Sequence, residues 1–281
     1  MNIKRINMRF SNINRYLIAI KNISYDRFYY ALKRRIDNIP NAIAWFINIG
    51  YSKKNKNKLL DYKNIHKGER CFILANGPSL NKIDFNLLKN EYTIGMNRIY
   101  LLQKVNGFIP DYLACIDEKC QLKQFYDEYN QLNIPCFFNW NQRKLFDKKS
   151  NQSFVKVKFS TGFSRDIVRS QTYNGASVTY TCIQLAYYMG FHEVYLIGKD
   201  HEYKCHVKAG KTSISDGAEK NHFIDGYYKK GQVWDSPTYE VEECAYEIAK
   251  SVFEKENKVI KDATVGGKLN VFEKVDFNSL F

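Results

Sequence analysis

One histidine stands in a sequence context that favours acid–base chemistry. His222 follows residues 204–220, which are rich in Gly, Ser and Lys, and it precedes two tyrosines, Tyr227 and Tyr228. A histidine gains and loses a proton near neutral pH, so it can take a proton from an acceptor hydroxyl during group transfer. Tyrosine hydroxyls can stabilise the charge on a departing phosphate. The pattern therefore predicts His222 as a general base, helped by the tyrosines.

Polar residues follow four successive apolar segments that are predicted to be strands. The first segment, residues 71–74, runs directly into a tight turn. In open α/β sheets, ligands bind where strands end and helices begin. We therefore expect these residues to form one binding edge, with the first turn holding the phosphate–sugar part of an activated donor. They are Asn76, Gly77, Pro78 and Ser79 after the first strand, Asn97 and Arg98 after residues 92–96, Asp117 after 112–116, and Asn139 after 134–138.

Two further segments add candidate ligand-binding residues. Gly175 and Ser177 precede an apolar helix predicted over residues 178–190. Small residues at a helix start leave backbone N–H groups open to an anion, although Gly175 is equally consistent with close packing of helix on sheet. The buried strand 193–198 is followed by Asp200 and by two histidines, His201 and His206, which compete with His222 for the role of base.

The elements that must position these residues alternate between strand and helix. Helices are predicted over residues 83–88, 121–130 and 236–256, and further strands over 154–159 and 258–261. Such alternation predicts an α/β fold with a doubly wound, mostly parallel sheet.

The charge is unevenly distributed and divides the chain. Residues 1–70 carry 16 Lys or Arg and 4 Asp or Glu, about +12 of the total net charge of +14. We predict a basic, amphipathic helical arm over residues 1–66 and a catalytic domain over 67–281. Apolar faces beside clustered lysines suit the surface of an anionic membrane. The alternative, in which these faces pack on the domain or on a second copy in a homo-oligomer, stays open, while nucleic acid is disfavoured because no binding motif is present.

The cysteines and the hydropathy bear on location. None of the seven cysteines forms a CxxC pair, which favours reduced core residues of a cytoplasmic protein. No cleavable signal peptide and no membrane-spanning segment is evident. The sequence therefore predicts a cytoplasmic protein that is peripheral on the inner face of the membrane through residues 1–60.

The order of the motifs resembles a known group of proteins. Asn-Gly-Pro-Ser-Leu at 76–80, Gly-x-Asp-x-x-Tyr at 198–203, Asn-His-Phe at 221–223 and a Gly-Gly-Lys turn at 266–268 follow in this order. The chain resembles the bacterial CMP-sialic-acid-dependent sialyltransferases of lipooligosaccharide synthesis. It looks even more like their relatives, the hydroxymethylpterin pyrophosphokinase-like (MptE-like) proteins. The resemblance covers roughly residues 60–281.

This resemblance implies a Rossmann-like fold and an inverting glycosyltransferase that uses a nucleotide-activated sugar, with a CMP-linked sugar favoured. It implies that Asn76, Asn97 and Ser177 bind the donor, that His222 is the base, and that Tyr203 contacts the leaving phosphate. Asp117 departs from the sialyltransferase pattern, which has an Asn there. The expected acceptor is a glycan or glycolipid of surface polysaccharide, capsule or lipopolysaccharide synthesis. No cofactor and no metal are expected.

Two other functions stay open. A pyrophosphokinase would use ATP and Mg²⁺, which Asp117 and Asp200 would hold at strand ends. Against it, the chain lacks the G-x-x-x-x-G-K-[ST] loop of many nucleotide-binding proteins. A non-catalytic, sugar-nucleotide-binding assembly subunit would have the same fold, because fold does not determine function.

Overall fold

The computed structural model of this protein describes residues 36, 38–203 and 209–281. The chain forms two compact units, residues 1–47 and residues 48–281. The predicted arm up to residue 35, together with Cys205 and His206, lies outside the described residues. The α-helices are α3 (Ile39–Phe46), α4 (Gly50–Asp61), α5 (Leu102–Asn106), α6 (Lys123–Asn130), α7 (Val178–Met189) and α8 (Tyr239–Glu254). Short 3₁₀ or π turns are η1 (Pro78–Lys82), η2 (Phe85–Leu88), η3 (Asn97–Leu101), η4 (Glu118–Leu122), η5 (Trp140–Leu145) and η6 (Asn278–Leu280).

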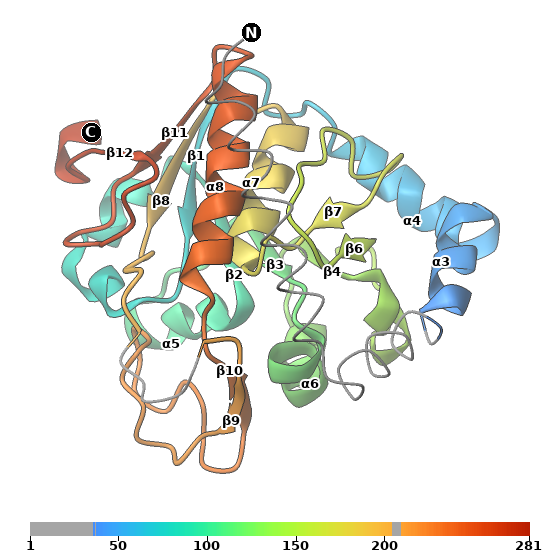
Figure 1. Cartoon of the computed structure of the whole chain (residues 1–281), viewed down its shortest axis with the longest axis horizontal. Helices are drawn as coiled ribbons and strands as arrows, with labels where there is room; N and C mark the ends of the chain where they lie inside the picture. Colours follow the sequence, from blue (N-terminus) through green and yellow to red (C-terminus); the bar gives the residue numbers. More distant parts are fainter. Residues whose placement is uncertain (1–35, 37, 204–208) are drawn as a thin grey trace, which may run out of the picture. The chain divides into compact units, whose positions relative to one another are not determined.

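A single eight-stranded sheet forms the centre of the larger unit (Figure 1). Its order is β12-β11-β8-β1-β2-β3-β4-β5, and every neighbouring pair is parallel. This confirms the predicted α/β class. The strands are β1 (Arg70–Leu74), β2 (Tyr92–Met96), β3 (Tyr112–Cys115), β4 (Cys136–Asn139), β5 (Gln152–Val155), β8 (Glu193–Ile197), β11 (Val259–Asp262) and β12 (Glu273–Lys274), with the pairs β6 (Val157–Lys158) and β7 (Thr172–Tyr173), and β9 (Thr212–Ile214) and β10 (Val233–Asp235), forming two small sheets.

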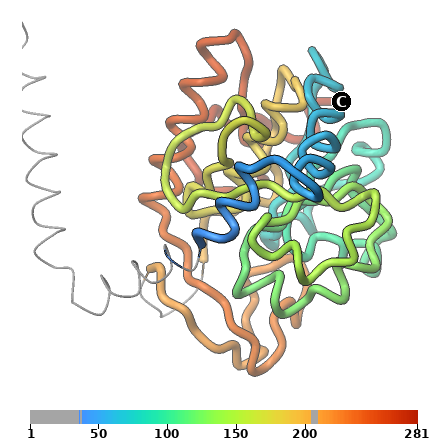
Figure 2. Tube along the Cα trace, turned by 90° about the vertical axis from the view of Figure 1, so that its right-hand side faces the viewer, coloured from blue at the N-terminus to red at the C-terminus, as the bar shows by residue number. Residues whose placement is uncertain are grey.

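The central strands are apolar because both faces of the sheet are covered. β1 is buried from Cys71 to Leu74 and β4 along its whole length, as expected for a parallel sheet between layers. The helices α7 and α8 lie next to one another (Figure 1, Figure 2) and contact strands of the sheet. Of the six cysteines in the described residues, five are buried and Cys244 is exposed, which agrees with the predicted core positions of those five.

The predicted elements are mostly present, with local differences. The strand predicted over 154–159 is two short strands, β5 and β6, that belong to different sheets. The helix predicted over 83–88 is the 3₁₀ turn η2, whose N-cap Asp84 accepts a hydrogen bond from the backbone N–H of Asn86. Within residues 36, 38–203 and 209–281, no helix has the length and hydrophobicity needed to cross a membrane.

The structure divides the chain earlier than residue 66. The larger unit begins at Asn48 and includes α4, whose Ser52, Asn55 and Leu59 are buried. The Asn55 side chain donates to the carbonyl of Phe154 and accepts from its N–H, both at 2.8 Å. These bonds tie α4 to the edge strand β5, so this helix is an integral part of the domain.

Candidate functional site

The polar turns lie where the strand order reverses. From β1 the chain proceeds outward through β2, β3, β4 and β5, and then returns to place β8 on the other side of β1. Such a reversal opens a crevice at the carboxyl ends of the two strands, which is the usual ligand site of open α/β sheets. The turn at Asn76–Ser79 and the segment Gly198–His201 therefore face each other across this switch point.

Asp200 shapes the turn that follows β1. Its carboxylate accepts hydrogen bonds from the backbone N–H of Ser79 at 3.2 Å and from its hydroxyl at 2.7 Å. The N–H of Gly77 donates to the carbonyl of Gly198 at 2.9 Å. A Cβ atom on Gly77 would lie 1.8 Å from Oδ2 of Asp200, so only glycine allows this approach. Three predicted ligand-binding residues thus hold each other in place.

Two buried amide oxygens beside this turn have no hydrogen-bond partner in the part of the chain that the structure describes. The side-chain N–H of Asn76 donates to the carbonyl of Met96 at 3.1 Å, which fixes the amide orientation and leaves Oδ1 buried without a hydrogen bond. Oδ1 of Asn97, on a left-handed backbone with φ 50°, is likewise buried and unpaired. A buried unpaired acceptor is costly. Two such acceptors, at the ends of the neighbouring strands β1 and β2, favour a ligand that brings N–H or O–H donors.

The start of α7 lies beside the end of β2. The hydroxyl of Thr179 contacts the sulfur of Met96 at 3.4 Å. Ser177 caps the helix, and its Oγ accepts from the N–H of Thr179 at 3.2 Å. Gly175 has φ 49°, and a Cβ there would lie 2.5 Å from the ring of Tyr180, so close packing explains this glycine. Ser177 lies near the candidate site, but its seen role is helix capping.

A buried ion pair that we did not predict follows β8. Nζ of Lys199 lies 2.7 Å from the Glu242 carboxylate on α8, with side chains 14% and 4% exposed. Burial opposes the charge on Lys199, but Glu242 outweighs it and holds the pKa of the lysine above its ordinary value. The signal was present in the sequence as a lysine directly after a strand, within Gly-Lys-Asp-His at 198–201.

His222 is held by a carboxylate and by an aromatic stack. Its Nδ1 lies 2.8 Å from Oε1 of Glu219, and both side chains are 11% exposed. Its ring stacks on Tyr227 with centroids 3.8 Å apart and planes 2° apart. Nε2 forms no hydrogen bond with the described part of the chain. A histidine with one nitrogen fixed by a carboxylate and the other open has the arrangement of a general base.

The segment that carries His222 is tied to the turn after β1. The N–H of Phe223 donates to the carbonyl of Asn76 at 2.9 Å. The side-chain amide of Asn81 donates to the carbonyl of Phe223 at 2.8 Å. His222 therefore lies next to the same turn that carries the unpaired amide oxygen of Asn76, although 146 residues separate them in sequence.

The predicted tyrosines surround His222 and are engaged with the protein. The hydroxyl of Tyr227 accepts from the N–H of Arg98 at 3.2 Å, and the Arg98 guanidinium donates to the carbonyl of Tyr227. The hydroxyl of Tyr228 accepts from Gln121. Burial raises the pKa of both tyrosines well above its ordinary value. Tyr203 packs edge-on to His222 at 5.8 Å. Positioning of His222 is thus the visible role of Tyr227.

The remaining predicted residues lie at strand ends but have local partners. Asp117 accepts from the N–H groups of Lys119 and Cys120, and burial raises its pKa. Asn139 is fully buried and bonds the carbonyl of Ile116 and the N–H of Asn141. His201 pairs through Nε2 with Glu243 at 2.8 Å, while its Nδ1 is buried and has no partner within residues 36, 38–203 and 209–281.

The two carboxylates suggested as a joint metal site are far apart. Asp117 follows β3 and Asp200 follows β8, and two strands, β1 and β2, lie between. At a strand spacing of about 4.8 Å, their backbones are separated by about 14 Å, too far to share one ion. Within the described part of the chain, no group of three His, Cys, Asp or Glu side chains has the arrangement of a metal site.

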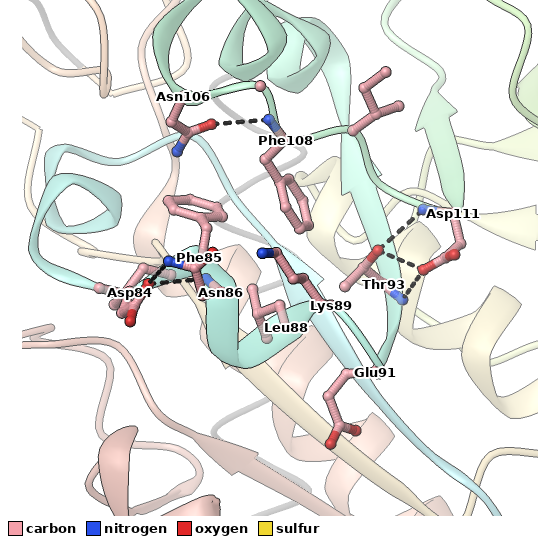
Figure 3. Close-up of a pocket in the computed structure, with 13 residues that line it drawn as sticks. Asp84, Phe85, Asn86, Leu88, Lys89, Glu91, Thr93, Asn106, Phe108 and Asp111 are labelled. Atoms are coloured by element: carbon pink, nitrogen blue, oxygen red, sulfur yellow. Dashed lines mark hydrogen bonds between the residues drawn. The ribbon is translucent and has the colours of Figure 1, made fainter.

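A separate cavity of about 470 Å³ lies at the end of the sheet where the strands begin, opposite the carboxyl ends that carry the candidate site (Figure 3). It is lined by Thr93 near the start of β2 and by Asp111 just before β3. The carboxylate of Asp111 accepts hydrogen bonds from the hydroxyl and N–H of Thr93, at 2.7 and 2.8 Å. Figure 3 draws these bonds as dashed lines. Because these residues mark amino ends of strands, the cavity is distinct from the site at the carboxyl ends.

The fold and the site define a parallel α/β protein with a polar switch-point site and a histidine–carboxylate pair. Residues 44–205 match a protein family described as 6-hydroxymethylpterin diphosphokinase MptE-like, and the chain belongs to this family. The resemblance predicted from the motif order is thereby confirmed. No curated protein sequence matches the chain.

Two solved structures have a distant similarity to the chain. The MAf glycosyltransferase from Magnetospirillum magneticum AMB-1 has a TM-score of 0.49 and 17% identity, over 85% of this chain and 41% of that one. This chain therefore spans about two fifths of that protein. The sialyltransferase CstII from Campylobacter jejuni, in complex with the substrate analogue cytidine-5'-monophosphate, has a TM-score of 0.46 and 13% identity, over 75% of this chain and 86% of that one.

Proposed function

We propose that the chain is an inverting glycosyltransferase that uses a nucleotide-activated sugar, with a CMP-linked acidic sugar favoured. The observation that carries the proposal is that a candidate base, His222, lies next to a buried amide oxygen of Asn76 that has no hydrogen-bond partner among the described residues. The N–H of Phe223, the residue after His222, donates to the backbone carbonyl of Asn76, whose side-chain Oδ1 is buried and has no partner among the described residues. Donor hydroxyl or amino groups would satisfy the amide oxygens of Asn76 and Asn97.

The reaction follows from these positions. Nε2 of His222 takes the proton of an acceptor hydroxyl as that oxygen attacks the anomeric carbon. The bond from this carbon to the phosphate oxygen breaks, and the nucleotide leaves with the electron pair. A single displacement inverts the anomeric centre. A monophosphate leaving group carries less charge than a diphosphate, so we expect turnover without a metal, and the choice of CMP comes from the motif order in the sequence.

A screen of ligands tests the donor. We expect CMP-N-acetylneuraminic acid to raise the melting temperature of the full chain without Mg²⁺, because a ligand that binds only the folded state stabilises it. The His222→Ala variant should keep this shift and lose turnover of the donor. UDP- and GDP-sugars serve as controls for the nucleotide. Stabilisation by no nucleotide sugar, or undiminished turnover in His222→Ala, would overturn the proposal.

The family description favours one alternative, a diphosphokinase that consumes ATP with Mg²⁺. Asp117 and Asp200 are too far apart to bind one Mg²⁺ together, as this alternative suggested. Their separation does not exclude diphosphokinase activity. In the same screen, this alternative requires stabilisation by ATP only when Mg²⁺ is present, together with ATP consumption. A non-catalytic binding subunit requires donor binding that is never followed by turnover.

The proposal also places the enzyme at the inner face of the membrane, where a glycolipid acceptor of lipopolysaccharide or capsule synthesis would be found. Residues 1–35 contain nine Lys or Arg and one acidic residue. In the smaller unit, Ile36, Ile39, Ile43 and Ile47 are each 50–55% exposed. Ile39 and Ile43, which are four residues apart, lie on one side of α3. An apolar helical face next to a basic segment suits an anionic bilayer surface.

A further inference from the structure

Among the described residues, Glu219 alone holds the imidazole of His222 by a hydrogen bond. Its Oε1 lies 2.8 Å from Nδ1, and its Oε2 accepts from the backbone N–H of Asn221 at 2.9 Å. Both carboxylate oxygens are therefore engaged, and the side chain has one fixed orientation. Because Glu219 precedes His222 by three residues, the pair is formed within one short segment.

The protonation state of Glu219 determines which nitrogen of His222 is open. Burial opposes the charge on this carboxyl group, but the hydrogen bonds from His222 and Asn221 keep its pKa below the ordinary value. The group is thus an ionised acceptor at neutral pH, and Nδ1 of His222 must donate to it. A neutral His222 then carries its proton on Nδ1 and has its lone pair on Nε2.

The aromatic neighbours fix the plane of the ring. Tyr227 covers one face at 3.8 Å, and Tyr228 and Tyr203 pack edge-on at 5.6 and 5.8 Å. Tyr227 is itself anchored to Arg98, whose guanidinium lies 4.0 Å from the ring centre of Phe125. The plane comes from this stack, whereas no aromatic neighbour can select a tautomer.

We propose that Glu219 is a positioning residue that fixes His222 as the Nδ1–H tautomer and makes Nε2 the proton acceptor. The role of base rests on the proposed function, whereas the tautomer does not. In the reaction, the acceptor proton moves to Nε2, His222 becomes an imidazolium, and Glu219 stabilises its charge without taking the proton. The proton later leaves from Nε2 to water.

The tautomer is measured by ¹⁵N NMR of the histidine side chains in the full chain, with His222→Ala assigning the signal. We expect an Nδ1–H pattern in the wild type and a shift toward Nε2–H in Glu219→Gln. The matched control is Glu243→Gln, which changes the carboxylate partner of a different histidine, His201, and should leave the His222 signal unchanged. An unchanged His222 signal in Glu219→Gln overturns the inference.

Kinetics separates positioning from a purely structural role. With CMP-N-acetylneuraminic acid as the probe donor, Glu219→Gln should lower kcat about 10-fold or more with KM nearly unchanged, and Glu219→Asp should recover part of the loss. A higher KM with an unchanged kcat contradicts the inference. If the wild type turns over no nucleotide sugar, the proposed function fails, and the NMR result still decides the tautomer.

Discussion

At the scale of single residues, the candidate site depends on groups whose partners are distant in sequence. Ser79 and Asp200 are 121 residues apart, and Arg98 and Tyr227 are 129 apart. Each member is an ordinary turn or loop residue by itself. Strand-end geometry predicted that Ser79 and Arg98 would lie at one edge of the sheet. It did not predict that they bond Asp200 and Tyr227, or which side chains remain open to a ligand.

Lys156 gives a prediction about pH. It is 1% exposed, and its Nζ donates to Oδ1 of Asn141 at 2.9 Å. Burial, helped by the charge of Arg143, lowers its pKa from 10.5 to about 8. Between these values the unfolded chain binds the proton and the folded chain does not, so this lysine makes the free energy of unfolding rise with pH, by up to about 3 kcal/mol.

The variant Lys156→Met should therefore flatten the rise in stability across this pH window and be more stable than the wild type below it. Urea unfolding at pH values below, within and above the window measures the effect. Lys158→Met, at an exposed neighbouring lysine, is the control and should follow the wild type. A parallel pH profile for Lys156→Met and wild type would contradict the assignment.

At the scale of elements, the sequence predicted the sheet better than its attachments. β1, β2 and β8 were predicted because each is a short apolar run bounded by polar turns. The role of α4 was not predicted, because its charge pattern Lys-Lys-Asn-Lys-Asn-Lys indicates a solvated helix. The burial of one face of α4 becomes visible only in the structure, where the Asn55 side chain bonds the backbone of Phe154. Similarly, Glu219 and His222 show i,i+3 spacing in the sequence, but outside a helix this spacing does not establish contact.

Asn55→Ala tests the attachment of α4. It would leave the buried N–H and carbonyl of Phe154 without partners, so we expect a loss of about 2–4 kcal/mol in the free energy of unfolding. Asn57→Ala, at an exposed position of the same helix, is the matched control and should change stability little. Urea unfolding of both variants compares them. Equal losses of unfolding free energy in the two variants would show that the hydrogen bonds between Asn55 and Phe154 do not stabilise the protein.

At the scale of the whole molecule, the boundary at residue 48 changes how the basic arm is tested. Removing residues 1–60 would also remove most of α4 and would confuse a loss of membrane binding with a loss of folding. Substitutions in the full chain avoid this, because the isoleucines of α3 are exposed. The excess of basic residues over residues 1–70 is plain in the sequence, but charge alone does not mark where a folded unit begins.

Ile39→Glu with Ile43→Glu should lower binding to vesicles of phosphatidylcholine and phosphatidylglycerol about 10-fold or more, because each buried isoleucine contributes about 1.5–3 kcal/mol. Vesicle flotation measures the bound fraction. Ile109→Glu with Val265→Glu, at exposed apolar positions of the larger unit, is the matched control. Unaltered vesicle binding by the α3 variant, or no vesicle binding by the wild type, would exclude this face as the membrane contact. Binding of the wild type to nucleic acid, or its self-association, would then point to another partner.

The hydrogen bonds between Asn55 and Phe154 have a consequence for how the protein behaves at high concentration. The side-chain amide of Asn55 bonds the outer N–H and carbonyl of Phe154 in β5, as a neighbouring strand would. The other outer strand of the sheet is β12, which has only two residues. Open strand edges recruit other chains into shared sheets. A fragment that begins after residue 61 would expose such an edge, and we expect it to precipitate during expression, whereas a fragment that begins at residue 48 should stay dispersed.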